Sequence, residues 1–227
     1  MDVRDLALQA ACPVIAAPRF GPLPDMDNGQ RIILAANGVF VQVKLDWLDC
    51  IQRLSPALPI PLPYGSIEER LAFSFGVLPI RLIEDFIEAG RRGLPNEVAG
   101  ALIYSRHSRN LRLASCEPIA VSTERIDYRV PAMAVDLHTH GQGRPFWSNR
   151  DDGDDQGIKV AGVFGYLHQA KPQAKFRLVV NGWFHALPHP WQDDAGADRI
   201  REATLAPGLL RRILNFYQRR RFGPWNT

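Results

Sequence analysis

The chain has 227 residues, of which 46% are hydrophobic, and its formal net charge is only +3. A chain of this length can bury a sizeable core, and so small a net charge gives no broad signal of nucleic-acid binding. Its three cysteines lie far apart and form no CxxC pair, which argues against a disulfide framework and against a thiolate zinc site. No apolar run approaches the roughly 20 residues that a membrane helix needs, and the mixed-charge start is unlike a signal peptide, so we expect a cytoplasmic protein.

The N-terminal part predicts a small unit built on a β-hairpin. Residues up to about 28 are rich in proline and small residues without a sustained period, so we expect an arm on the surface. Two apolar runs, 32–34 and 39–43, flank an Asn-Gly pair at 37–38, which is best able to adopt the positive φ values of a type I′ turn. From 46 to 54 the apolar residues recur at helical spacing and predict a short amphipathic helix against the hairpin.

A change in composition then marks a domain boundary. Four prolines between residues 56 and 63 predict a stiff, extended bridge. We therefore expect two domains, an N-terminal arm with a small hairpin-and-helix subdomain over residues 1–65 and a larger domain over residues 66–227.

Two helices are predicted at the start of the larger domain. Residues 66–69 have the form of a capping box, which would open the first helix. Pro79 suits the first turn of the second, and Gly90 or Gly93 would end it. The residues that share the apolar face of this second helix are Ile80, Ile83 and Ile87.

The rest of the larger domain reads mainly as strands. Apolar runs separated by turn-prone segments predict seven strands, at 98–104, 111–114, 118–122, 126–130, 132–140, 158–167 and 176–180. A last helix is expected from about 207 to 220. Helices, then several strands, then a terminal helix indicate an α+β fold.

One stretch carries residue types that suit a metal site. His138 and His140 lie two residues apart at the end of a predicted strand, so both fall on the same face. A loop containing glycine then leads to the hydroxyl of Ser148 and the carboxylate of Asp151. Two imidazoles and one carboxylate can bind zinc and leave a fourth position for water, as catalytic zinc sites do and structural ones do not.

The spacing His-x-His, seven residues, Ser, two residues, Asp resembles the signature of the JAMM (MPN-type) zinc metallopeptidases, which remove ubiquitin or ubiquitin-like proteins from their attachment points. That family also has an upstream glutamate followed by a small apolar run, and the run that begins at Glu97 has this form. The resemblance implies a mixed β-sheet flanked by helices, with Zn²⁺ bound by His138, His140 and Asp151. It also implies that Glu97 is the catalytic acid/base and that Ser148 stabilises the tetrahedral intermediate.

Each of these residues also has a simpler interpretation. The two histidines could be ordinary strand residues, and Ser148 could cap the helical turn that starts at residue 149. Asp151 shares its segment with three other aspartates, which together could form a solvated acidic turn, and only its offset from Ser148 singles it out. Glu97 follows a Pro-Asn pair and could be a charge at a helix end or strand edge.

The loop between the ligands has features of its own. Gly141 stands where many members of the family have proline, which bears on the rigidity of the loop. Phe146 and Trp147 could line a groove for an extended peptide tail, or they could anchor the loop by packing against the protein.

Other functions fit parts of the pattern. Residues 136–140 also resemble the first motif of PHP-type phosphoesterases, but that motif lies near the start of about 250 residues of β/α repeats, and here only residues 141–227 follow it. A non-catalytic MPN-type scaffold usually lacks ligands, and none is missing from this sequence. A zinc deaminase is excluded because the His-x-Glu and Pro-Cys-x-x-Cys motifs are absent.

The whole chain also resembles a component of the PRTRC cassettes of plasmids and other mobile elements. Their name records ParB-related and ThiF-related members. The resemblance therefore implies a ThiF-like protein and a ubiquitin-like or sulfur-carrier-like protein as partners. The activity that it implies is hydrolysis of peptide or isopeptide bonds at the tail of that small protein.

Overall fold

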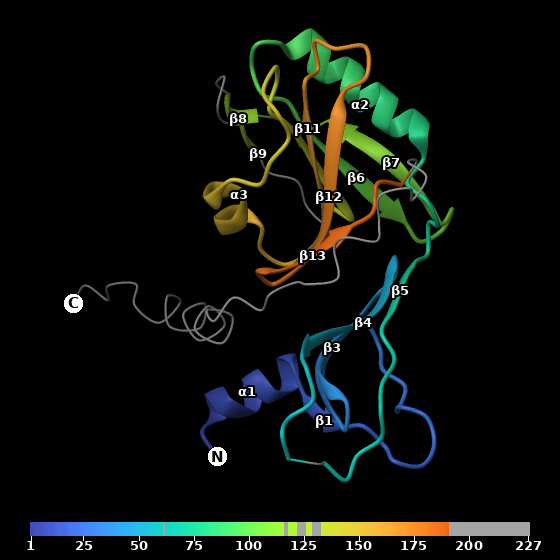
Figure 1. Ribbon diagram of the computed structural model, residues 1–227. Helices are drawn as coiled ribbons and strands as arrows, with labels where there is room; N and C mark the ends of the chain where they lie inside the picture. The colour runs from blue at the N-terminus through green and yellow to red at the C-terminus, as the bar shows by residue number, and fades with distance from the viewer. Residues whose placement is uncertain (61, 116–117, 122–125, 129–132, 191–227) are drawn as a thin grey trace, which may run out of the picture. The chain divides into compact units, whose positions relative to one another are not determined.

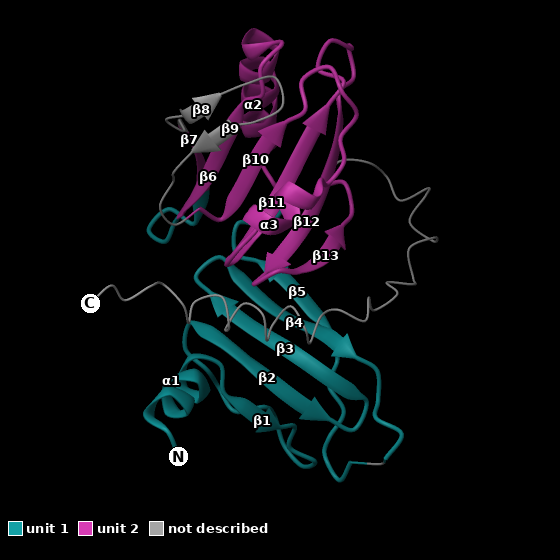
Figure 2. Ribbon diagram, turned by 90° about the vertical axis from the view of Figure 1, so that its left-hand side faces the viewer, with its two compact units in different colours: residues 1–77, 105–110 teal, residues 78–104, 111–227 magenta. Residues whose placement is uncertain are grey.

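The computed structural model of the chain describes residues 1–60, 62–115, 118–121, 126–128 and 133–190. The chain divides into two compact units, unit 1 with residues 1–77 and 105–110, and unit 2 with residues 78–104 and 111–227 (Figure 2). The boundary expected after residue 65 therefore lies inside unit 1, ahead of a strand that pairs with the rest of that unit.

Unit 1 is a five-stranded sheet with a short helix at its N-terminus (Figure 1). The strands are neighbours in chain order, with β1 parallel to β2 and the other pairs antiparallel. The elements are α1 (Val3–Ala11), β1 (Val14–Ala16), β2 (Gly29–Ala35), β3 (Gly38–Leu45), β4 (Leu48–Ser55) and β5 (Arg70–Phe73).

The predicted hairpin is confirmed as β2 and β3, and the N-terminal arm is mostly exposed as expected, although it contains α1 and β1. Asp2 caps α1 by accepting the Arg4 N–H at 2.8 Å, and β1 then pairs with β2. The helix has no buried residue. Its large apolar residues, Val3, Leu6 and Leu8, are therefore exposed.

The segment 46–54 forms a strand and not the predicted helix. Asp46 and Trp47 make the two-residue turn between β3 and β4, so that Leu45 lies opposite Leu48. The buried residues of β4 are Leu48, Cys50, Ile51 and Gln52, which lie on both faces of the sheet. A strand covered on both faces lacks the polar alternation of a half-buried strand, and its apolar residues then fit helical spacing equally well.

The turn between β2 and β3 differs from the expected one. Its central residues are 36 and 37, and Asn37 keeps a negative φ. The Asn37 side chain instead donates to Ile67 O at 2.8 Å and accepts the Ile67 N–H at 3.0 Å. Because the backbone of residue 67 is bound in this way, residues 66–69 run into β5 and do not form the helix start that the capping-box pattern predicts.

Unit 2 contains a six-stranded mixed sheet in the order β13-β12-β11-β10-β6-β7, and β8 and β9 form a separate pair (Figure 1). β10 and β11 are parallel, whereas β10 with β6, β11 with β12 and β12 with β13 are antiparallel. The elements are α2 (Ile80–Gly93), β6 (Ala99–Ser105), β7 (Asn110–Ser115), β8 (Pro118–Val121), β9 (Ile126–Tyr128), β10 (Val135–Thr139), α3 (Asn149–Asp154), β11 (Ile158–Gly165), β12 (Gln173–Val180) and β13 (Trp183–Leu187). The α+β fold class is confirmed.

β13 was not predicted, although Asn181 and Gly182, with φ of +49° and +83°, form the two-residue turn that joins it to β12. The helix expected at 207–220 lies outside the described residues. Within the described parts of the chain, no helix is long and apolar enough to cross a membrane.

Helix α2 packs on the sheet through a stripe that differs slightly from the predicted one. Its buried residues are Ile83, Phe86 and Gly90, whereas Ile80 is half exposed. Phe86 lies on Gly100 of β6, where an added Cβ would come within 2.7 Å of the ring. The same ring meets Phe164 of β11 edge to face at 5.3 Å. The helix therefore fixes the central strands from which the site is built.

We expect Asn37→Ala to lower the free energy of unfolding of unit 1 by about 1–3 kcal/mol, because two backbone groups of Ile67 lose their partner. Asn28→Ala is the matched control, since it removes a single exposed hydrogen bond to Asp46 and should cost less than about 0.5 kcal/mol. Urea denaturation of each variant measures both values. Equal losses for the two substitutions would contradict this role of Asn37.

Candidate metal centre

The two predicted histidines are positioned by β10, which has a strand on each side. It pairs with β6 in antiparallel register and with β11 in parallel register. Leu137 is fully buried, and since side chains alternate along a strand, His138 points to the other face and His140 shares that face. His140 stays aligned beyond the end of β10 because its N–H donates to Phe164 O at 2.7 Å.

The loop 141–147 is held against the end of β11. Tyr166 N–H donates to Gly143 O at 2.7 Å. Gly165 permits this close approach, since a Cβ there would lie 2.4 Å from Gly143 O. Gly141 has a φ of +52°, which proline cannot adopt. The backbone of this loop therefore takes a conformation that is closed to the proline often found at this position in the family.

Helix α3 presents the predicted carboxylate. Ser148 is its N-cap, and its Oγ accepts the Asp151 N–H at 3.1 Å. In return, Asp151 Oδ2 accepts the Ser148 N–H at 2.6 Å, which completes a capping box. The second carboxylate oxygen, Oδ1, lies 3.5 Å from His138 Nε2. The predicted cap is thus confirmed, and the contacts that begin the helix also orient Asp151.

The side chains of His138, His140 and Asp151 converge closely enough to hold a metal ion. Their ligand atoms all lie within 4.8 Å of one another. With zinc–ligand bonds of about 2.0–2.2 Å, two ligands of a tetrahedral ion are about 3.3–3.5 Å apart, and the Asp151 Oδ1 to His138 Nε2 distance is 3.5 Å. Among the described residues, His138 Nε2 is the buried side-chain atom that has no hydrogen-bond partner. A bound metal would supply that partner.

Burial lowers the pKa of both His138 and His140, and the Asp151 carboxylate partly opposes this effect. The desolvated surroundings disfavour the charged imidazolium, so both rings are neutral near pH 7. The neutral imidazole is the form that binds a metal ion.

Glu97 lies two residues before β6, the strand that pairs with β10. The pairing of β6 with β10 is continued by Thr139 N–H, which donates to Val98 O at 3.0 Å. The next position in this register places Glu97 opposite His140, on the face that both histidines share. Glu97 is half-buried and takes part in interactions within the chain.

Aromatic side chains surround the histidines. Phe146 meets the His140 ring edge to face at 4.6 Å, and Trp147 meets the His138 ring at 5.9 Å. The Arg177 guanidinium lies over the Trp147 ring, 3.9 Å from its centre. Trp147 therefore anchors the loop, whereas Phe146 is 41% exposed beside His140. Of the two roles considered for this pair, anchoring the loop thus applies to Trp147, and contact with a peptide stays a prediction for Phe146.

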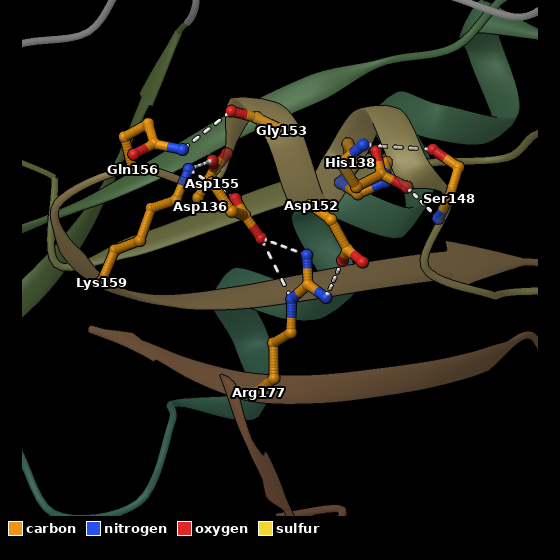
Figure 3. Close-up of polar contacts among 10 residues, drawn as sticks. Asp136, His138, Ser148, Asp152, Gly153, Asp155, Gln156, Lys159 and Arg177 are labelled. Atoms are coloured by element: carbon orange, nitrogen blue, oxygen red, sulfur yellow. Dashed lines mark hydrogen bonds and ion pairs between the residues drawn. The ribbon is translucent and has the colours of Figure 1, made fainter. Parts of the chain in front are cut away.

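A buried ionic network supports α3 from below (Figure 3). Arg177 on β12 binds Asp155 at 2.5 Å and Asp152 at 2.7 Å. Lys159 on β11 binds Asp155 at 2.8 Å and Asp136 of β10 at 2.5 Å. Sequence reasoning did not single out Arg177 or Lys159, although an arginine inside the apolar run 176–180 was an available signal.

We expect the wild-type chain to bind one Zn²⁺, and Asp151→Asn to weaken that binding by more than about 100-fold, since changes outside the ligand shell already cost 10–100-fold. Asn can still accept the Ser148 N–H, so α3 should keep its cap. Asp154→Asn removes the same charge from an exposed position of the same helix and should leave affinity unchanged. Competition with a chromophoric zinc chelator measures all three proteins, and equal affinities would exclude Asp151 as a ligand.

Arg177→Met should lower the free energy of unfolding of unit 2 by about 3–5 kcal/mol, because Asp152 loses its cation and the buried Asp155 keeps only Lys159. Lys175→Met, on an exposed position of the same strand, should change stability by less than about 0.5 kcal/mol. Chemical denaturation provides the comparison. A loss of similar size in both variants would show that the Arg177 network does not stabilise unit 2.

Comparison with known proteins separates the two parts of the chain. Residues 79–179 match the family described as prokaryotic homologs of the JAB domain, and residues 2–74 match a domain of unknown function, DUF2016. No curated protein matches the chain. A solution structure of a protein from Desulfitobacterium hafniense is 16% identical, with a TM-score of 0.39, over 47% of this chain and 86% of that one. Residues 79–179 thus form a JAB/MPN-type domain, preceded by a DUF2016 domain.

Proposed function

We propose that this protein is a zinc-dependent hydrolase that cleaves peptide or isopeptide bonds at the tail of a ubiquitin-like or sulfur-carrier-like protein. The observation that carries the proposal is the convergence of His138, His140 and Asp151, with His138 Nε2 buried and without a hydrogen-bond partner among the described residues. JAB-type domains include both peptidases and inactive scaffolds. A complete ligand set favours the peptidase.

The proposed roles follow from the position of each group. His138, His140 and Asp151 would hold Zn²⁺, which when bound polarises the scissile carbonyl and makes water more acidic. Glu97, on the same face of the sheet, would take the proton of the attacking water and return it to the leaving amine. The Ser148 Oγ accepts one hydrogen bond from Asp151 N–H, so its own hydrogen is left to donate to the oxygen on which charge develops.

The substrate class rests on two further points. The exposed face of Phe146 beside His140 offers an apolar contact for an extended chain. The resemblance to the PRTRC cassettes adds a ThiF-like protein, which implies a small ubiquitin-like or sulfur-carrier-like partner. A barrel phosphoesterase of the PHP type has less support, because β10 lies in an open mixed sheet and not in a ring of β/α repeats.

The test compares enzyme with scaffold through Glu97→Gln. We expect this variant to retain zinc and to lose about 10²–10⁴ in turnover, since the amide cannot carry the proton. Glu84→Gln, an exposed substitution on α2, is the matched control and should keep full activity. Turnover is measured on a ubiquitin-like protein extended at its C-terminus, and zinc by elemental analysis.

Three results would contradict the proposal. Equal turnover by the wild type and Glu97→Gln would rule out the proton-transfer role. Loss of zinc from Glu97→Gln would make the residue a ligand. A wild type that binds both zinc and the ubiquitin-like protein but never cleaves it would be a scaffold.

A further inference from the structure

Unit 1 contains a cavity of about 310 Å³. The segment 22–26 forms one wall. The side chains that line the rest are those of Arg31, Gln42, Lys44, Asp49 and Arg70. The cavity lies within the DUF2016 domain and is independent of the metal ligands, which all belong to unit 2.

The register of the sheet explains why these polar side chains gather. Arg31 on β2 lies opposite Gln42 on β3, and Lys44 on β3 lies opposite Asp49 on β4. Gln42 and Lys44 are two residues apart, so all four side chains share one face of the sheet. The other end of this face is apolar, with Ile33, Ala35, Phe40 and Ile51 packed together. At the charged end Arg31 is the buried side chain, whereas the side chains of Asp49 and Arg70 are about half exposed, so the cost of burying a charge falls on Arg31.

The buried charge at the cavity forms no ion pair with a described residue. Arg31 is only 6% exposed, and the acceptors that it contacts are neutral, Gln42 Oε1 at 2.8 Å and Pro24 O at 2.6 Å. Among the described residues, no carboxylate lies within ion-pair distance of Arg31 or Lys44. Burial lowers the pKa of Arg31, and the charge of Asp25, which lines the same cavity, partly opposes this effect. A desolvated guanidinium in this position is stabilised by an anion.

The remaining carboxylate of the wall is already engaged. Asp49 accepts from Arg70 at 2.8 Å, so it does not neutralise Arg31 or Lys44. Arg31 uses Nε and one terminal nitrogen, which leaves the other terminal nitrogen without a partner in the described part of the chain. The Gln42 amide nitrogen likewise has no hydrogen bond to a described residue. One terminal nitrogen of Arg31, the amide nitrogen of Gln42 and the ammonium group of Lys44 therefore remain to bind a ligand at this end of the face.

We propose that this cavity binds a small anion through a carboxylate or phosphate group. Arg31 and Gln42 would donate hydrogen bonds to its oxygens, and Lys44 would add a second positive charge. The Arg31 contact with Pro24 O also fixes the wall that covers the ligand. The anion would give the DUF2016 domain a binding function of its own, separate from hydrolysis in unit 2.

The test titrates the full-length protein calorimetrically with inorganic phosphate and, separately, with N-acetylglycine as a carboxylate. We expect saturable binding of at least one probe, weakened about tenfold or more by Lys44→Gln, since hydrogen bonds to charged groups are the stronger ones. Lys44 is half-buried and makes no hydrogen bond to a described residue, so this variant should fold normally. Arg53→Gln, which removes an exposed charge of the same sheet away from the cavity, is the matched control and should bind as the wild type does.

A second variant separates this site from the metal centre. The double substitution His138→Ala with His140→Ala should bind the anion as tightly as the wild type does. The probe that binds more tightly identifies the ligand as a phosphate ester or a carboxylate. No saturable binding of either probe at millimolar concentration, equal affinity in Lys44→Gln, or loss of binding in the double histidine variant would overturn the proposal.

Discussion

The direction of the Asp151 carboxylate depends on the capping box at the start of α3. One carboxylate oxygen accepts the Ser148 N–H, and the other is thereby turned toward His138. A helix of six residues has little stability of its own. The same pair of contacts therefore both starts the helix and aims the Asp151 carboxylate at the histidines. Ser148 therefore has a structural role as a helix cap that does not depend on catalysis.

The short helix in turn depends on buried charges beneath it. Arg177 and Lys159 meet at Asp155, and Lys159 extends the contact to Asp136 on β10. Such a network is weak evidence for stability, because desolvating the ions offsets much of their attraction. Its contribution is to hold α3 in a defined orientation relative to the strands. It joins the strand that carries His138 to the helix that carries Asp151, so the two ligands cannot shift independently.

The sequence predicted what short-range patterns encode. The strands around His138 and the offset from His140 to Asp151 are readable because apolar runs and fixed spacings are local. Two of the three Asn-Gly pairs show the limit of local reasoning. Asn181 and Gly182 take the positive φ values that such a pair favours in a tight turn, but Asn37 binds the backbone of Ile67, thirty residues away. That tertiary contact overrides the turn preference.

The same limit explains the other differences. β4 was mistaken for a helix because both of its faces are covered, which removes alternation from its sequence. Arg177 was missed because its carboxylates lie more than twenty residues away in the chain. The position of Glu97 beside His140 follows from strand pairing, which a single sequence does not display. Local sequence patterns thus identified the candidate ligands, and the sheet together with α3 brings them close to one another.

The buried Nε2 of His138 has a further consequence if a metal ion binds there. Among the described residues this atom has no hydrogen-bond partner, and a buried nitrogen in that state costs about 1–3 kcal/mol. An ion that binds only the folded chain would add about 2.7 kcal/mol of stability when present at 100 times its Kd. A shortage of that ion would then lower the folded fraction and leave more molecules open to proteases. The metal level of the cell would in this way affect how long the protein lasts.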